Sequence, residues 1–144
     1  MTDTALTIPT TPAAYKYWVD EHVRFADLDL IGHVNNKAYA TYGESCRAAF
    51  LREVGLWEPG APRQSVIVKL EINYLRELHY PNRIRIGLCV LRMGDKSCTF
   101  GLGVFKGEEC ISTMLTVMVR IDAVSRKAVT LNDQERAALA GYRV

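Results

Sequence analysis

The sequence lacks a long apolar run, a strong charge bias and any closely spaced pair of cysteines. No apolar stretch approaches the roughly 18 residues of a membrane-spanning helix, so no membrane partner is expected. A net charge of +2 is too small to favour a nucleic-acid ligand. The four cysteines include no C-x-x-C pair, and no histidine stands at zinc-finger spacing, so the sequence predicts neither a metal site nor a cofactor. We expect reduced thiols, which favour a cytoplasmic location.

The N-terminal segment also lacks the features of a secretion signal. Residues 1–14 are rich in Thr, Pro and Ala, without a basic region followed by an apolar one, and we interpret them as a flexible tail. Residues 15–144 are then expected to form a single domain. A chain of 144 residues with 49% hydrophobic residues is long enough to bury one core.

What the chain does contain is one helical pattern followed by strand-like patterns. Residues 17–25 predict a short strand, and apolar spacing predicts a long helix from Asn35 or Asn36 to Val54, ending before Gly55. Asn132 and Glu135 have the spacing of a capping box that opens a short final helix. Four segments alternate apolar and polar residues, as strands against a core do: 66–74, 84–90, 98–104 and 111–121.

Short turns at 93–96 and 106–108 indicate that neighbouring strands are antiparallel. A single helix cannot cover a sheet of this size on both faces. We therefore expect an α+β fold in which a curved antiparallel β-sheet wraps around one long central α-helix.

The segment between the first strand and the helix carries most of the chemistry. It reads Arg24-Phe25-Ala26-Asp27-Leu28-Asp29-Leu30-Ile31-Gly32-His33-Val34-Asn35-Asn36. A carboxylate, a glycine turn, an imidazole and two amides are delivered to a helix N-terminus, where unpaired N–H groups and the helix dipole favour negative charge. This arrangement suits a site in which a base works beside donors for a developing oxyanion.

The Asp-x-x-Gly-His-Val-Asn-Asn pattern at 29–36 closely resembles the hotdog-fold thioesterases of the 4-hydroxybenzoyl-CoA thioesterase and acyl-CoA thioester hydrolase group. The resemblance extends from about residue 17 to residue 121 and includes Tyr39, the helix segment 42–47 and the strand end 119–122. It implies an enzyme that hydrolyses an acyl- or aroyl-CoA to the free acid and CoA. No cofactor is implied, because the CoA thioester is the substrate.

The resemblance also implies roles for individual residues. Asp29 matches the catalytic carboxylate, as a nucleophile or as a general base. Backbone N–H groups near the helix start match the oxyanion donors, and the candidate oxyanion and substrate-binding residues are Gly32, His33, Val34, Asn35 and Asn36. The basic and polar turn residues that become candidates for CoA contacts are Arg92, Lys96 and Ser97.

Each of these residues also has a plainer interpretation. Asp29 suits a turn, His33 suits a structural histidine that orients the loop, and Asp27 is expected to be exposed or structural. Glu44 is either a second carboxylate near the pocket or an i, i+3 partner of Arg47. Arg92, Lys96 and Ser97 are ordinary solvated turn residues by default.

Two other functions compete with the thioesterase. A hotdog hydratase or dehydratase acting on acyl-CoA or acyl-carrier protein would use His33 and Glu44 as its acid/base pair, but the loop lacks that branch's His-Phe-Pro pattern. A non-catalytic acyl-CoA-binding domain is the other alternative, and it would not need Asp29.

The predicted sheet also suggests an assembly. Family members are dimers or tetramers, and exposed sheet edges invite pairing between copies, so we expect a homodimer or homotetramer. In the last strand we take the odd-numbered residues from Ile111 to Ile121 as the core-facing stripe. Phe105, Met114 and Met118 lie on the opposite phase of their strands and are candidates for a second, intersubunit face.

Overall fold

The computed structural model of the chain describes residues 6–144, and the first five residues of the predicted tail lie outside that range. The strands are β1 (Tyr17–His22), β2 (Arg63–Tyr74), β3 (Arg83–Met93), β4 (Ser97–Lys106) and β5 (Glu109–Asp122). The α-helices are α1 (Asn36–Glu53) and α2 (Asp133–Ala140), and short 3-10 turns lie at Pro12–Ala14 and Phe25–Asp27. No helix within residues 6–144 is long and apolar enough to cross a membrane.

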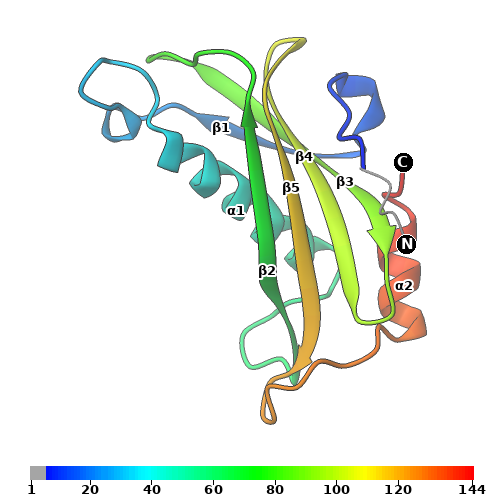
Figure 1. Cartoon of the computed structure of the whole chain (residues 1–144). Helices are drawn as coiled ribbons and strands as arrows, with labels where there is room; N and C mark the ends of the chain where they lie inside the picture. The colour runs from blue at the N-terminus through cyan, green and yellow to red at the C-terminus, as the bar shows by residue number, and fades with distance from the viewer. Residues whose placement is uncertain (1–5) are drawn as a thin grey trace.

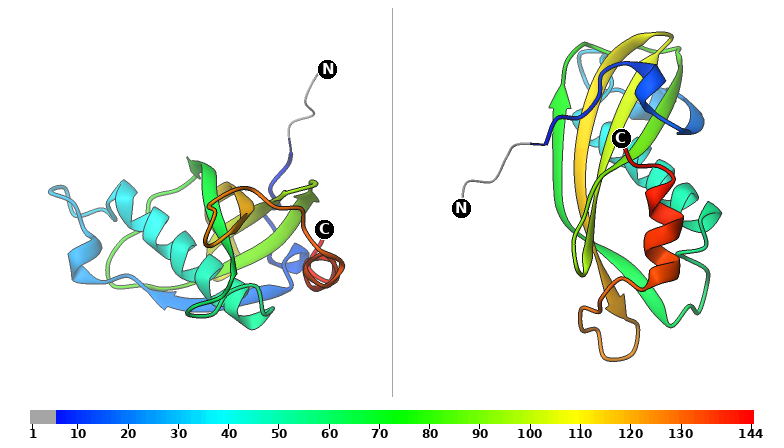
Figure 2. Two further views of the ribbon diagram at one scale, coloured as in Figure 1. Left: turned by 90° about the horizontal axis from the view of Figure 1, so that it is seen from below. Right: turned by 90° about the vertical axis from the view of Figure 1, so that its right-hand side faces the viewer.

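The five strands form one antiparallel sheet in the order β1-β3-β4-β5-β2, and α1 crosses its concave side (Figure 1). The sheet curves around the helix, as the view from below shows (Figure 2). Core side chains of α1 pack on the central strands, with Tyr42, Cys46 and Phe50 at 1% exposure or less. This is the predicted hotdog architecture, with a curved sheet wrapped around one long helix.

Gly43 lies where the side chain of Met114 on β5 reaches α1. A Cβ atom at this position would be 2.6 Å from the sulfur of Met114 on β5, which is closer than real contacts allow. The helix therefore tolerates the propensity cost of glycine in its interior because the side chain of Met114 fills the space. α1 ends as predicted, with Gly55 just beyond its C-terminus at φ +78°.

The prediction that the odd-numbered residues of β5 face the core is wrong from Leu115 to Val119, whereas Ile111 and Ile121 at its ends are buried as predicted. The helix-facing residues include Met114 and Thr116, both fully buried, whereas Leu115, Val117 and Val119 are half-buried on the outer face. The reason is an irregularity in the β4–β5 pairing: Val104 pairs with Ser112 and Phe105 pairs with Cys110, so Ile111 is an extra residue on β5. A second irregularity places an extra residue on β2, between Ile67 and Lys69. Each such bulge reverses the alternation of side chains beyond it.

The proposed intersubunit role of Phe105 and Met114 is therefore also wrong, because both are fully buried within the protomer. Met114 packs against α1. Phe105 packs edge-on against Tyr15, which precedes β1, and against Trp18 on β1; these rings lie over the outer face of β3 and β4. An aromatic cluster covers that part of the sheet.

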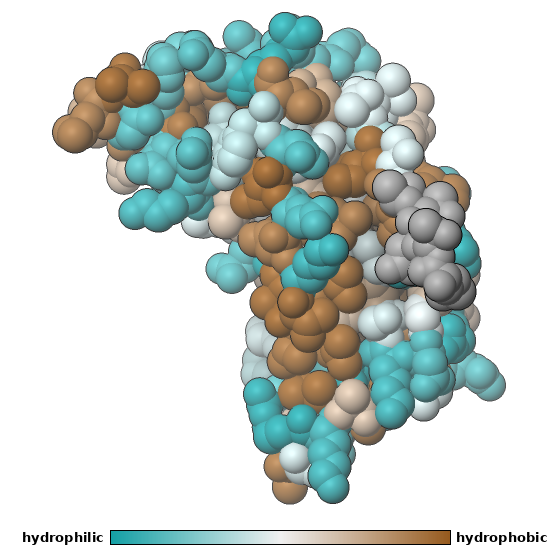
Figure 3. Space-filling model, in the orientation of Figure 1, coloured by the Kyte–Doolittle hydropathy of each residue, from teal (hydrophilic) through white to brown (hydrophobic). Residues whose placement is uncertain are grey.

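The outer face over β2 and β5 stays apolar and accessible. A broad hydrophobic band runs along these two strands in the space-filling view (Figure 3). Val68 is 59% exposed there, beside half-buried Leu115, Val117 and Val119. The exposed ion pair of Lys69 and Glu71 interrupts this band. An apolar surface of this kind is typical of a contact between proteins.

A buried charge cluster joins α2 to the sheet. Glu135 on α2 accepts hydrogen bonds from Arg120 on β5 and Arg63 on β2, each at 2.7 Å. The predicted capping box is present, with the Asn132 side chain accepting from the Glu135 N–H and the Glu135 carboxylate accepting from the Asn132 N–H. The four cysteines are free thiols, of which Cys46, Cys89 and Cys98 are buried and Cys110 is half-buried.

Candidate active site

The motif forms a tight hairpin-like loop between β1 and α1. Leu28 and Val34 face each other as an isolated antiparallel bridge, and the N–H of Asp29 donates to the carbonyl of His33 at 2.8 Å. Gly32 adopts φ +83°, a conformation that other residues rarely reach, so the turn requires a glycine there. The loop tip exposes Leu30 and Ile31 to solvent.

One oxygen of Asp29 is held by this loop and the other is free. Oδ1 accepts hydrogen bonds from the backbone N–H groups of Ile31 at 3.0 Å and His33 at 3.1 Å. Oδ2 has no hydrogen-bond partner anywhere in residues 6–144, and the side chain is half-buried. The turn role and the chemical role considered for Asp29 are thus compatible, because each uses a different oxygen.

Asp27 connects the same loop to α1 and has a structural role, as expected. Its Oδ2 accepts the hydroxyl of Tyr42 at 2.6 Å and the N–H of Arg24 at 2.9 Å. Burial, followed by this hydrogen bond to a carboxylate, raises the pKa of Tyr42 far above its ordinary value. The contact fixes the motif loop to the second turn of the helix.

The start of α1 leaves one of the candidate oxyanion donors free. Asn35 is the N-cap, and its side chain accepts from the N–H of Lys37 at 2.9 Å. The N–H groups of Gly32, His33, Val34 and Asn35 are all engaged within the protein. The Asn36 N–H has no partner among the described residues, so of the five candidates it alone offers a hydrogen bond at the positive end of the helix.

Asp29 and Asn36 line the same cleft, which has a volume of about 440 Å³. The end of β2 and the segment after it supply the opposite wall, with Tyr74, Arg76 and Glu77. The hydroxyl of Tyr74 donates to the carbonyl of Asn36 at 3.2 Å, so this wall is attached to the first residue of the helix. The cleft is therefore lined both by the residue that has a free carboxylate oxygen and by the residue that has a free N–H donor.

The sequence did not predict that the residues of the opposite wall belong to the site. They lie about 40 positions after the motif, and only the sheet order brings them beside it. The one available signal is that the polar run Arg76-Glu77 interrupts the strand alternation after Tyr74.

Glu44 lies in a different cleft, of about 260 Å³, with Arg47, Ile67 and Met118. It stands eight residues into α1, about 12 Å along the axis from Asn36. Burial lowers the pKa of Arg47, and the nearby Glu44 acts in the opposite sense. One protomer thus does not bring Glu44 together with His33 as the acid/base pair that a dehydratase would need.

The candidate CoA contacts Arg92, Lys96 and Ser97 lie at the β3–β4 hairpin. The motif loop lies beside the opposite end of β3, where Val23 pairs with Asn82. Because β3 has 11 residues at about 3.3 Å each, the hairpin is roughly 30 Å from the cleft. Within one protomer these three residues are therefore too far from Asp29 to line the same cleft, whereas Arg76 does line it.

Comparisons with known proteins agree with this architecture. The family model of the thioesterase-like superfamily matches residues 23–139. The chain is 28% identical over 132 residues to the uncharacterised protein YsmA of Bacillus subtilis, covering 90% of this chain and 89% of that protein.

Two solved structures share both sequence and shape with the chain. The PA5185 protein of Pseudomonas aeruginosa is 27% identical with a TM-score of 0.86, covering 92% of this chain and 95% of its own. A thioesterase superfamily protein of Jannaschia sp. CCS1 is 27% identical with a TM-score of 0.83, covering 90% and 84%. The chain therefore belongs to the thioesterase-like superfamily.

Proposed function

We propose that the protein is a thioester hydrolase that converts an acyl- or aroyl-CoA to the free acid and CoA. One observation carries the proposal: a cleft lined by Asp29, with a free carboxylate oxygen, and by Asn36, with a free N–H at the start of α1. Membership of the thioesterase-like superfamily supports the same class of reaction.

The chemistry follows from these two groups. The thioester carbonyl oxygen accepts a hydrogen bond from the Asn36 N–H, which is placed to stabilise the negative charge of the tetrahedral intermediate. On the general-base route, Oδ2 of Asp29 takes a proton from water as the water attacks the carbonyl carbon. The C–S bond then breaks, and the thiolate of CoA leaves and takes up a proton.

On the nucleophilic route, Oδ2 attacks the carbonyl carbon itself and displaces the thiolate, and water then hydrolyses the resulting anhydride. Both routes need the same free oxygen and the same donor. The hydrogen bonds to Oδ1 hold the carboxylate in position in either case.

We further propose that the active form contains at least two copies of the chain. β2 is an edge strand with one unpaired side, and its apolar side chains Ile67, Val68 and Leu70 are between 38% and 59% exposed. Pairing β2 with a second copy would cover them and satisfy the free edge. Sedimentation velocity at micromolar concentration should show a dimer or tetramer, and a stable monomer would contradict this proposal.

The test of the activity is thiol release from a panel of aliphatic and aromatic acyl-CoAs, followed with a thiol reagent. We expect turnover of at least one member of the panel. Saturable binding of acyl-CoA without release of thiol would instead identify a binding domain. Release from an acyl-carrier protein but not from CoA would refute the CoA part of the proposal and keep the hydrolase.

A further inference from the structure

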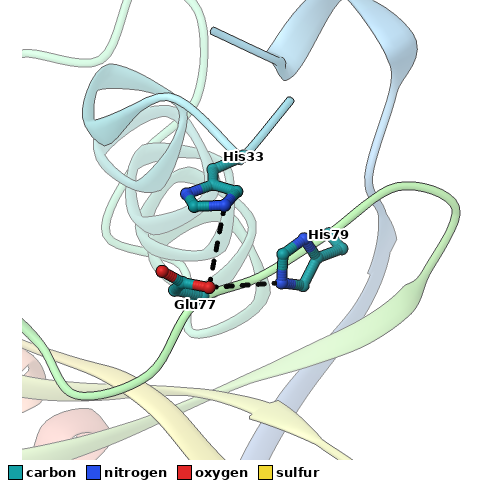
Figure 4. A group of neighbouring side chains, drawn as sticks. All are labelled: His33, Glu77 and His79. Carbon is teal, nitrogen blue, oxygen red and sulfur yellow. Dashed lines mark ion pairs between the residues drawn. The ribbon is translucent and has the colours of Figure 1, made fainter. Parts of the chain in front are cut away.

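Three side chains converge beside the motif loop without taking part in the reaction above. They are His33 from the loop, and Glu77 and His79 from the segment between β2 and β3 (Figure 4). Oε2 of Glu77 is 3.7 Å from Nε2 of His33 and 3.5 Å from Nε2 of His79. The two imidazole rings stand perpendicular, with their centroids 5.0 Å apart.

The backbone holds these three residues in place. His33 and His79 face each other as an antiparallel bridge, and the N–H of Val34 donates to the carbonyl of Leu78 at 3.0 Å. The side chain of Asn82 donates to the carbonyl of His79 at 3.0 Å. Since alternate residues of an extended segment point to the same side, the side chains of Glu77 and His79 lie on one side of the chain. The cluster is therefore organised by main-chain contacts before any ligand binds.

The spacing of the three ligand atoms is too long for hydrogen bonds. A hydrogen bond to a carboxylate is normally about 2.7–3.0 Å long, and a contact of about 3.6 Å is not one. Neither imidazole makes a side-chain hydrogen bond to any residue between 6 and 144. Two nitrogens and one oxygen thus lie within 4.8 Å of one another, in ion-pair range but without a hydrogen bond between them.

A metal ion accounts for this spacing. An ion with tetrahedral bonds of about 2.1 Å to nitrogen and oxygen sets its ligand atoms about 3.4 Å apart, close to the two nitrogen–oxygen separations of 3.7 and 3.5 Å. Two imidazoles and one carboxylate suit zinc and neighbouring transition metals, whereas calcium and magnesium prefer oxygen ligands. The partial exposure of all three side chains leaves a fourth position open to water.

We propose that His33, Glu77 and His79 bind one divalent transition-metal ion, with zinc as the best fit. The bound ion connects the motif loop to the segment after β2, so it stabilises the two walls of the cleft against each other. The chain's sequence does not reveal this site, because the two histidines are separated by 45 intervening residues and meet only in the fold.

The test is isothermal titration of the metal-free protein with Zn²⁺ at neutral pH, because metal binding requires deprotonated ligands. Wild type should bind one ion per chain, and its thermal unfolding midpoint should rise when Zn²⁺ is added. His79→Gln and Glu77→Gln should each weaken binding at least about tenfold and lose the rise in midpoint.

His22→Gln is the matched control, because His22 is the remaining histidine of the chain, lies on β1 and is not part of this group of three. It should bind Zn²⁺ as wild type does. Absence of saturable binding by wild type would overturn the proposal. Zn²⁺ binding that survives both His79→Gln and Glu77→Gln would also overturn it, since the ion would then be held elsewhere.

Discussion

The charge cluster that joins α2 to the sheet makes a quantitative prediction about acid stability. The side chain of Glu135 is only 8% exposed, and that of Arg120 is 5% exposed. Burial alone would raise the pKa of Glu135, but hydrogen bonds from Arg63, the Asn132 N–H and Arg120 outweigh it and lower the pKa from 4.5 to about 2. The folded protein therefore holds this carboxylate ionised well below its ordinary range.

The size of the effect follows from linkage. A pKa that falls from 4.5 in the unfolded chain to about 2 in the folded protein corresponds to about 3 kcal/mol of stability. Because the folded pKa is the lower one, this stability is present in full above pH 4.5 and is lost as the pH falls toward 2. At pH 3 about 2 kcal/mol of it should already be gone.

The perturbation is Glu135→Gln, measured by urea unfolding at pH 7 and pH 3. At pH 7 the variant should be less stable than wild type by about 3 kcal/mol, because Arg120 is left buried without its counter-charge. At pH 3 the difference in unfolding free energy between wild type and Glu135→Gln should be about 2 kcal/mol smaller, since only wild type loses the contribution of this carboxylate.

Glu108→Gln, in the exposed β4–β5 turn, serves as the control and should shift stability little at either pH. A gap between wild type and Glu135→Gln that is the same at both pH values would refute the reasoning. The charge cluster would then contribute through packing and shape alone.

Three further substitutions test the contacts that position the site. Gly43→Ala should destabilise the protein by about 1 kcal/mol in urea, because overlap of the new Cβ with buried Met114 costs about 2 kcal/mol and alanine regains about 1 kcal/mol of helix propensity. A gain in stability would contradict the close packing. Tyr42→Phe should cost about 1.5–3 kcal/mol by removing the hydrogen bond to Asp27, and a neutral result would show that this contact contributes nothing. Asn35→Ala should cost about 1 kcal/mol of stability by removing the N-cap of α1. It should also lower kcat by displacing the Asn36 N–H, and an unchanged kcat would show that this N–H is not the oxyanion donor.

The features predicted correctly from the sequence are those that depend on near neighbours in the chain. The long helix with its Asn35 cap and terminal Gly55, and the capping box at Asn132, are each specified within a few residues. Alternation located the strands for the same reason. The position of Asp29 in a tight turn before Gly32 also follows from local turn chemistry.

The features that the sequence did not reveal depend on distant contacts. The outward phase of Leu115 could not be predicted, because a single bulge reverses the side-chain alternation without leaving a clear signal in the sequence. The wall of the cleft at Tyr74 and Glu77 comes from sheet order, not from local pattern. The pairing of Arg120 with Glu135 likewise depends on how α2 folds back on the sheet.

The most direct test of the central claim is the kcat for the best acyl-CoA substrate in Asp29→Asn, measured beside Asp95→Asn. The first variant keeps the shape of the side chain and removes its charge, and the second removes an exposed carboxylate at the distant β3–β4 turn. We predict that kcat falls at least about 100-fold in Asp29→Asn, or about 2.7 kcal/mol of barrier, and stays unchanged in Asp95→Asn. Wild-type turnover by a folded Asp29→Asn protein would contradict the account.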